Sequence, residues 1–192
     1  MRVEKLAKTF GDQIQIEWKS FLLRTEPKVS DQEKFVKYTE SWLRPAATEP
    51  DAKFQVWATD NPGPTSSIPA QVAAKVMDGF APEAAEAFHW RLLEAYFSEN
   101  RTISDWSVLG DLAAEVGVDR QQFLTTVDEQ QRVASQMVID EHNAAIENGV
   151  TAVPTIVLDN VLPIPGAQEL ESYEIWINKL LAKRTPDAER EQ

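Results

Sequence analysis

The chain has 192 residues, of which 43% are hydrophobic, and this is enough for one domain of ordinary size or for a small domain with an insertion. Its net charge of −12 argues against a partner built on a phosphate backbone, and no apolar run is long enough for a transmembrane helix. The sequence contains no cysteine and two histidines, which excludes a disulfide, a thiolate metal site and a cysteine nucleophile within these residues.

The amino-terminal part predicts a helix, a turn and a strand. Apolar side chains share one helical face over residues 1–10, and Gly11 is expected to end that helix. Residues 14–18 alternate between apolar and polar, which is the period of a half-buried strand. The spacing at residues 30–33 is that of a capping box and predicts another helix, and a proline-rich loop is predicted over residues 44–69.

The middle of the chain is predicted to be helical almost throughout, from Pro69 to Asn148. Pro82 stands where the first residue of a helix is expected. Residues 119–122 form a second capping box that opens a helix, and a separate, longer helix is predicted from near Glu129.

The stretch after this helical block predicts a helix end, a short loop and a buried strand. Gly149 can adopt the left-handed conformation that ends a helix. Pro154 pushes Val153 toward extended geometry and cannot donate to a sheet, so it is expected at the start of the strand. The β-branched and apolar residues 155–158 have the composition of a central strand.

The carboxyl-terminal part completes a hairpin and a helix. Asp159 and Asn160 predict a turn into a second strand over residues 161–164, and an apolar stripe predicts a final helix over residues 170–180. Residues 185–192 are charged and are expected to form a disordered tail.

The resulting order of helix, strand, helical block, two strands and helix resembles the DsbA-like thioredoxin family. More narrowly, it resembles the soluble branch near 2-hydroxychromene-2-carboxylate isomerases and kappa-class glutathione transferases. The similarity is carried by residues 17–23, 102–119, 149–155 (Gly-Val-Thr-Ala-Val-Pro-Thr) and 165–168 (Pro-Gly-Ala-Gln). It implies an α/β thioredoxin-like fold over residues 1–30 and 149–184, with a large all-helical insertion over residues 31–148.

The resemblance breaks down at the amino end. The family begins with a central strand and a Cys-Pro-x-Cys-type motif at the start of a helix, whereas residues 2–8 look like the middle of that helix. We therefore expect the first strand to be missing, and we hypothesise that the chain is an amino-truncated version of a longer protein. An in-frame stop codon directly before Met1 would contradict this hypothesis.

The function implied by the resemblance is thiol–disulfide exchange, with Val153 and Pro154 as substrate-binding residues beside the reactive thiol. No catalytic residue is expected in this chain, which is predicted to be inactive as given. Three alternatives stay open: a redox-inactive module that binds peptides or glutathione, a relative of glutathione-dependent isomerases or transferases, and a plain loop-to-strand junction at Pro154.

The expected partners are a disulfide-containing protein or a small thiol, with no nucleic acid and no membrane. A homo-oligomer formed through exposed sheet edges is a further alternative. No cofactor is expected, although glutathione is a candidate ligand, and the predicted location is cytoplasmic if Met1 is the true start.

Other residues that could carry chemistry are better explained by structure. His89 and His142 lack the spacing of a zinc motif, so no metal is expected. Ser66 and Ser67 follow a glycine but lack the Walker lysine, and they are predicted to cap a helix. Aromatic residues that could line a cleft are more often part of the core, and here they are Trp57, Trp90, Trp106 and Tyr96.

Overall fold

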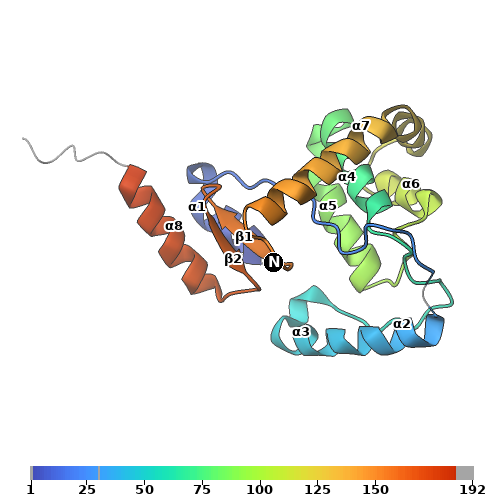
Figure 1. The fold of residues 1–192 in the computed structure, drawn as a ribbon, viewed down its shortest axis with the longest axis horizontal. Helices are drawn as coiled ribbons and strands as arrows, with labels where there is room; N and C mark the ends of the chain where they lie inside the picture. The colour runs from blue at the N-terminus through green and yellow to red at the C-terminus, as the bar shows by residue number, and fades with distance from the viewer. Residues whose placement is uncertain (1, 30, 185–192) are drawn as a thin grey trace, which may run out of the picture. The chain divides into compact units, whose positions relative to one another are not determined.

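A computed structural model of the chain describes residues 2–29 and 31–184 (Figure 1). The chain divides into two compact units, one made of Met1–Lys19 with Asn143–Gln192 and the other of Ser20–His142. The tail predicted over residues 185–192 lies outside the described residues. Within the described residues, no helix is both long enough and apolar enough to span a membrane.

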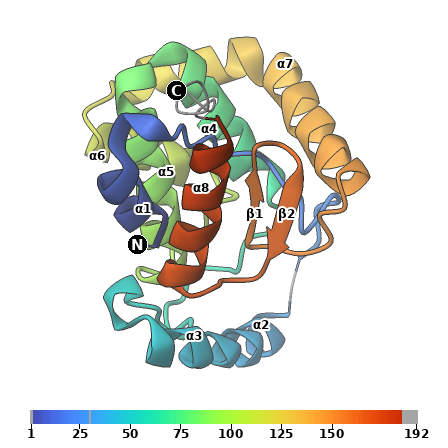
Figure 2. The same cartoon turned by 90° about the vertical axis from the view of Figure 1, so that its left-hand side faces the viewer.

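The first unit is a two-stranded hairpin with two helices packed on one face (Figure 2). Its elements are α1 (Arg2–Phe10), β1 (Thr155–Leu158), β2 (Leu162–Pro165) and α8 (Leu170–Arg184). Alternate residues of the strands point to the same face, so this face of the hairpin and the two helices share one apolar core. The core residues are Leu6, Phe10, Ile156, Leu158, Ile164, Tyr173 and Ile177.

The hairpin is antiparallel, and its register runs from Thr155 opposite Pro165 to Leu158 opposite Leu162. The predicted turn is confirmed: Asp159 and Asn160 have φ angles of 52° and 57°, a left-handed conformation that these two residue types tolerate. The second strand is confirmed with a shift of one residue in its bounds.

The strand predicted over residues 14–18 is wrong. Gly11 ends α1 as predicted, with φ at 50°, and a short 3-10 helix, η1 (Gly11–Gln13), follows it. Ile14 is extended, but the segment pairs with no strand, and Ile16 and Trp18 are 39% and 37% exposed. An alternating pattern favours an extended backbone, but a strand also needs a neighbour to complete its hydrogen bonds. None of the described residues provides that neighbour.

The second unit consists of helices around a core built from four of them. Its elements are α2 (Gln32–Thr39), η2 (Glu40–Trp42), α3 (Leu43–Thr48), η3 (Pro50–Ala52), α4 (Ile68–Phe80), α5 (Pro82–Phe97), α6 (Trp106–Glu115) and α7 (Arg120–Glu147) as far as His142, while the last turn of α7 belongs to the first unit. Helices α4 to α7 contribute the fully buried side chains Val72, Met77, Phe88, Leu109, Leu112, Phe123 and Val138. A smaller aromatic cluster around Phe35, Trp42 and Trp57 packs α2 and η2 against the loop at 53–57.

Three predictions in this unit need correction. A capping box was predicted at residues 30–33, but the residue that caps α2 is Asp31, whose Oδ1 accepts from the Lys34 N–H (3.0 Å). Residue 30 lies outside the described residues. The loop over 44–69 contains α3 and η3. The two helices predicted from residues 119 and 129 are one helix, α7. Residues 120–147 contain no glycine or proline, and good helix formers continue the helix through the polar stretch near Glu129.

Candidate functional site at the Val153–Pro154 loop

The loop that carries Val153 begins where α7 ends. Gly149 has a φ of 81°, and its N–H donates to the carbonyl of Ile146 (2.9 Å). The N–H of Val150 donates to the carbonyl of Ala145 (2.9 Å), which closes the last turn of the helix. The helix end predicted at Gly149 is therefore confirmed, and Val150 is buried immediately after it.

The loop itself is fixed by one contact on each side of Pro154. The Oγ1 of Thr155 donates to the carbonyl of Ala152 (2.6 Å), and the carbonyl of Pro154 accepts from the N–H of Gly166 (2.8 Å). The Val153–Pro154 peptide bond is cis. The Val153 side chain is 43% exposed, so an apolar, β-branched side chain faces solvent on a loop whose backbone is held in place.

A second loop, Gly166 to Gln168, supports the first one. Gly166 has a φ of 76°, and its carbonyl accepts from the Tyr173 hydroxyl (3.2 Å), which in turn accepts from the N–H of Gln168 (3.0 Å). The Arg2 guanidinium of α1 donates to the Gln168 carbonyl (2.6 Å). Sequence reasoning matched residues 165–168 to the family but missed the supporting role of Gly166 and Tyr173. The sequence feature that could have indicated this support is Gly166 itself, a glycine placed just after the second predicted strand.

The chemistry offered at Val153 and Pro154 is that of a backbone and of apolar side chains. Residues 149–158 contain no ionisable side chain, so recognition here depends on N–H groups, carbonyls and shape. Within residues 2–29 and 31–184, no three His, Asp or Glu side chains are grouped so that they could hold a metal ion.

Both residues of the Glu141–His142 pair hold a backbone segment in place. The Glu141 carboxylate accepts from the Ser20 N–H (2.7 Å) and from the Lys75 ammonium (2.9 Å), whose side chain is 9% exposed. His142 Nδ1 accepts from the Leu22 N–H (3.1 Å). Burial alone would raise the pKa of Glu141, but the hydrogen bonds from Lys75 and Ser20 outweigh it and lower the pKa.

His89 and the aromatic residues also have structural environments. Burial, and to a smaller extent the charge of Lys75, lowers the pKa of His89 from 6.5 to about 4. Trp57 is 1% exposed in the aromatic cluster, and burial raises the pKa of Tyr96 beside it to about 12. The Ser66 hydroxyl accepts from the N–H of Ile68, the first residue of α4 (3.1 Å), whereas Ser67 at the N-cap position makes no side-chain capping hydrogen bond. The capping role predicted for this loop is therefore found at Ser66 and not at Ser67.

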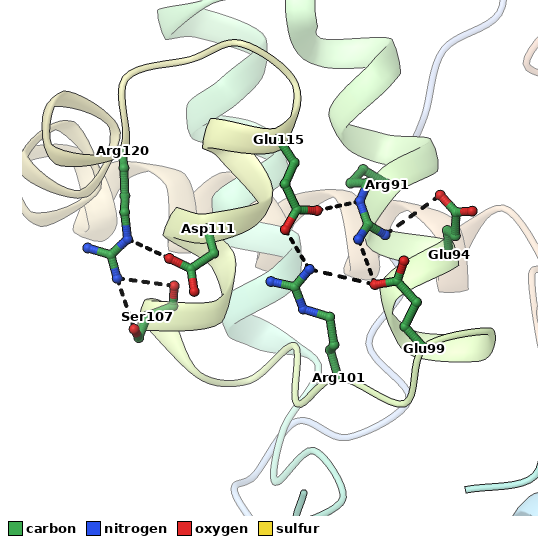
Figure 3. Close-up of polar contacts among 8 residues, drawn as sticks. All are labelled: Arg91, Glu94, Glu99, Arg101, Ser107, Asp111, Glu115 and Arg120. Carbon is green, nitrogen blue, oxygen red and sulfur yellow. Dashed lines mark hydrogen bonds and ion pairs between the residues drawn. The ribbon is translucent and has the colours of Figure 1, made fainter. Parts of the chain in front are cut away.

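A network of charged side chains, which sequence reasoning missed, joins α5 to α6 (Figure 3). The Arg91 guanidinium contacts both Glu99 and Glu115 at 2.6 Å, and Arg101 contacts Glu115 at 2.7 Å. Burial alone would raise the pKa of Glu115, but hydrogen bonds from Arg101 and Arg91 outweigh it and lower the pKa. Arg91 and Arg101 both form ion pairs with Glu99 and Glu115, so each charge has a partner of opposite sign within the network. This pairing indicates a structural role.

Comparison with known proteins agrees with this arrangement. The model of the DsbA-like thioredoxin domain matches residues 1–177. The uncharacterized protein YwbO of Bacillus subtilis (strain 168) is 27% identical over 173 residues, which cover 85% of this chain and 81% of YwbO. The fold is similar to that of the probable DsbA oxidoreductase SCO1869 from Streptomyces coelicolor, with a TM-score of 0.74, 21% identity, and 96% of this chain and 84% of that chain covered.

The fold is also similar to that of the cytosolic disulfide reductase DsbM from Pseudomonas aeruginosa with GSH. The TM-score is 0.70 and the identity 18%, and the similarity covers 95% of this chain and 90% of that chain. The family match includes α1, the hairpin and the Val153–Pro154 loop, together with most of α8. The α/β fold with its helical block, and the extent of this match, lead to one conclusion: the chain belongs to the DsbA-like thioredoxin domain family.

Proposed function

We propose that the Val153–Pro154 loop binds the backbone of an extended peptide from a disulfide-containing protein, or a small thiol such as glutathione. The observation that carries the proposal is the exposed Val153 beside Pro154, on a loop held by the Gly166 N–H and the Thr155 hydroxyl. The family is one of thiol–disulfide oxidoreductases, so a site for a disulfide-containing or thiol substrate agrees with it.

In this proposal the 192 residues supply binding without exchange chemistry. Thiol–disulfide exchange begins with a thiolate that attacks a disulfide and forms a mixed disulfide. The sequence holds no cysteine, so these residues can orient a substrate but cannot provide the attacking sulfur. The chain alone is therefore expected to show no insulin-reducing activity beyond the background rate of the reductant.

The alternative within the same site is a glutathione-binding relative of the isomerases and transferases. It is supported by the likeness to DsbM, whose structure is described with GSH. The peptide-binding proposal and the glutathione-binding alternative differ in the length of the ligand. Glutathione occupies only the surroundings of Val153, whereas a protein substrate presents an extended backbone on both sides of it.

The test measures binding of reduced glutathione and of a capped extended peptide by NMR titration. The variant is Val153→Glu, which places a charge on the proposed contact surface. The matched control is Val161→Glu, which adds the same charge at the 81% exposed hairpin turn. We expect Val153→Glu to weaken binding by about tenfold or more, the loss that follows when favourable contacts worth roughly 1.4 kcal/mol are removed. Equal affinity for both variants would contradict the proposal.

We propose in addition that residues 1–30 and 149–184 act as the thioredoxin-like part and residues 31–148 as a helical insertion. A cytoplasmic location is supported by the description of DsbM as cytosolic. Fractionation of cells that produce the full-length native protein, with detection of a carboxyl-terminal tag, would test the location.

A further inference from the structure

The sequence contains one Asn-Gly pair, Asn148–Gly149, which directly follows α7. In such a pair, a bond between the backbone nitrogen of the glycine and the side-chain carbon Cγ of the asparagine closes a five-membered ring. Glycine has no Cβ, so no side chain on the attacking residue obstructs this approach. The residues that follow the other asparagines are all bulkier, and they are Pro62, Arg101, Ala144, Val161 and Lys179.

The surroundings of this pair leave room for a reaction. Both residues are exposed, and a Cβ placed on Gly149 would meet nothing within 4 Å. Asn100 differs in both respects, because it is 2% exposed and its side-chain amide is hydrogen-bonded to the backbone of Gln55 and Ala58. Water therefore reaches the side-chain amide of Asn148, whereas that of Asn100 is enclosed and held.

Hydrogen bonds at the end of α7 restrain the Gly149 nitrogen. The Gly149 N–H donates to the carbonyl of Ile146 and the Val150 N–H to the carbonyl of Ala145, both at 2.9 Å. The nitrogen attacks only after it has lost its proton, and the bond to Ile146 holds that proton in place. Val150 is buried, which fixes the chain on the other side of the pair. Ring closure therefore requires the last turn of α7 to open, as helix ends do by fraying.

We propose that Asn148 is a site of spontaneous deamidation, and that opening of the last turn of α7 sets the rate. The deprotonated Gly149 nitrogen forms a bond to Cγ of Asn148, the Cγ–Nδ2 bond breaks, and ammonia leaves with the proton. Water then opens the resulting succinimide at either of its two carbonyl groups and leaves aspartate or isoaspartate at this position. The sum is one water consumed and one ammonia released, so no oxidant, reductant or cofactor is needed. Neither step uses the ligand proposed for the Val153–Pro154 loop.

Either product weakens the end of α7. Isoaspartate carries the main chain through its side-chain carbon, and the added backbone atom shifts the N–H groups of Gly149 and Val150 away from the carbonyls they bond to. Aspartate keeps the backbone but places a negative charge at the carboxyl end of a helix, where the macrodipole disfavours it. The modification therefore loosens the segment that leads from α7 to the Val153–Pro154 loop. Hydrogen exchange of the Val150 amide should be faster in the isoaspartate form, and an unchanged exchange rate would contradict this effect.

The test incubates the full chain in mildly alkaline buffer made with oxygen-18 water, folded in one sample and unfolded in guanidinium chloride in the other. Digestion and mass spectrometry locate the label and distinguish isoaspartate from aspartate. We expect both labelled products at residue 148, with the folded chain slower by roughly tenfold to a hundredfold because two hydrogen bonds must open. Aspartate without isoaspartate would overturn the cyclic route, and equal rates would overturn control by the helix end. No label at this residue of the folded chain, after the time that a reaction slower by about a hundredfold needs, would overturn the whole proposal.

Three variants separate the chemistry from the control of its rate. Asn148→Gln keeps an amide but would need a larger ring, so it should stay unlabelled at that residue. Glu147→Lys places a cation at the end of α7, which stabilises the last turn, and should slow the folded reaction by roughly twofold to fivefold without changing the rate in guanidinium chloride. Glu129→Lys makes the same change of charge far from the helix end and is the matched control, whose rate should equal that of the unmodified chain. Equal rates for the two lysine variants in the folded state would contradict control by the helix end.

Discussion

His89 on α5 is expected to make the folded protein less stable as the pH falls below about 6.5. Burial, with a smaller effect of the Lys75 charge, lowers its pKa from 6.5 to about 4 in the folded state. The unfolded chain therefore binds a proton at a higher pH than the folded chain does. Stability that depends on neutral His89 is fully present above the unfolded pKa and is lost progressively as the pH falls toward the folded pKa of about 4.

The expected loss in the free energy of unfolding follows from the change in the pKa of His89. At 1.36 kcal/mol per pKa unit, a change from 6.5 to about 4 sets an upper limit of about 3 kcal/mol. At about pH 5, where unfolded histidine is nearly all charged and the folded form is not, the loss reaches about 2 kcal/mol. The His89 side chain is only partly buried, and solvent screening reduces the expected loss to roughly 1–2 kcal/mol.

The assay is urea unfolding, followed by tryptophan fluorescence, at a series of pH values from about 7.5 to about 4.5, which spans most of the interval between the two pKa values. The variant His89→Gln cannot be protonated, so its free energy of unfolding should fall less than that of the unmodified chain over this range. His142→Gln is the control, because the sequence has only these two histidines. The lowered pKa of Glu141 places the effect of that carboxyl at lower pH.

Two results would refute the reasoning about His89. One is an equal loss of stability in His89→Gln and in the unmodified chain, which would assign the pH dependence to other groups. The other is an NMR titration in which the His89 imidazole of the folded protein gains its proton near the ordinary value.

Two further predictions concern packing and charge in the second unit. Gly63→Ala should destabilise by roughly 1–3 kcal/mol, because the new Cβ would lie 2.5 Å from a ring atom of Phe35, whereas Gly79→Ala, which meets nothing within 4 Å, should be neutral or stabilising in thermal unfolding. Arg91→Met, at a side chain 15% exposed, should cost about 1–3 kcal/mol of unfolding free energy, because Glu99 and Glu115 lose one of the two arginines that they share and keep only Arg101. Arg120→Met, at a side chain 40% exposed, should cost less than about 1 kcal/mol. Equal losses for the two arginine variants in urea unfolding would contradict the structural role of the network.

Features with a local cause could be predicted from the sequence. The helix ends at Gly11 and Gly149 follow from backbone conformations that glycine adopts easily, and Pro82 marks the first residue of α5. The hairpin was predicted because its turn contains Asp159 and Asn160, which tolerate the left-handed conformation. In each case the deciding interactions lie within a few residues.

Features that depend on distant partners could not be predicted in this way. The alternation at residues 14–18 is compatible with a strand, but pairing depends on a neighbour that the local pattern does not identify. The contact of Arg91 with Glu115 joins residues 24 positions apart, which no helical or strand period relates. The loop at Pro154 was located from its own residues and from the family resemblance, whereas its support by Gly166 became visible only in three dimensions.

The hydrogen bonds between Ser20 and Glu141 and between Leu22 and His142 bear on which segment of the chain could be deleted or transferred to another protein. They fasten the first residues of the second unit to its last ones, so the two ends of Ser20–His142 are neighbours. A segment whose two ends lie close together can be deleted and replaced by a short flexible linker. It can also be inserted into a surface loop of another protein without moving the two ends of that loop apart. The 123 residues from Ser20 to His142 therefore have the close termini that insertion of a domain into another protein requires.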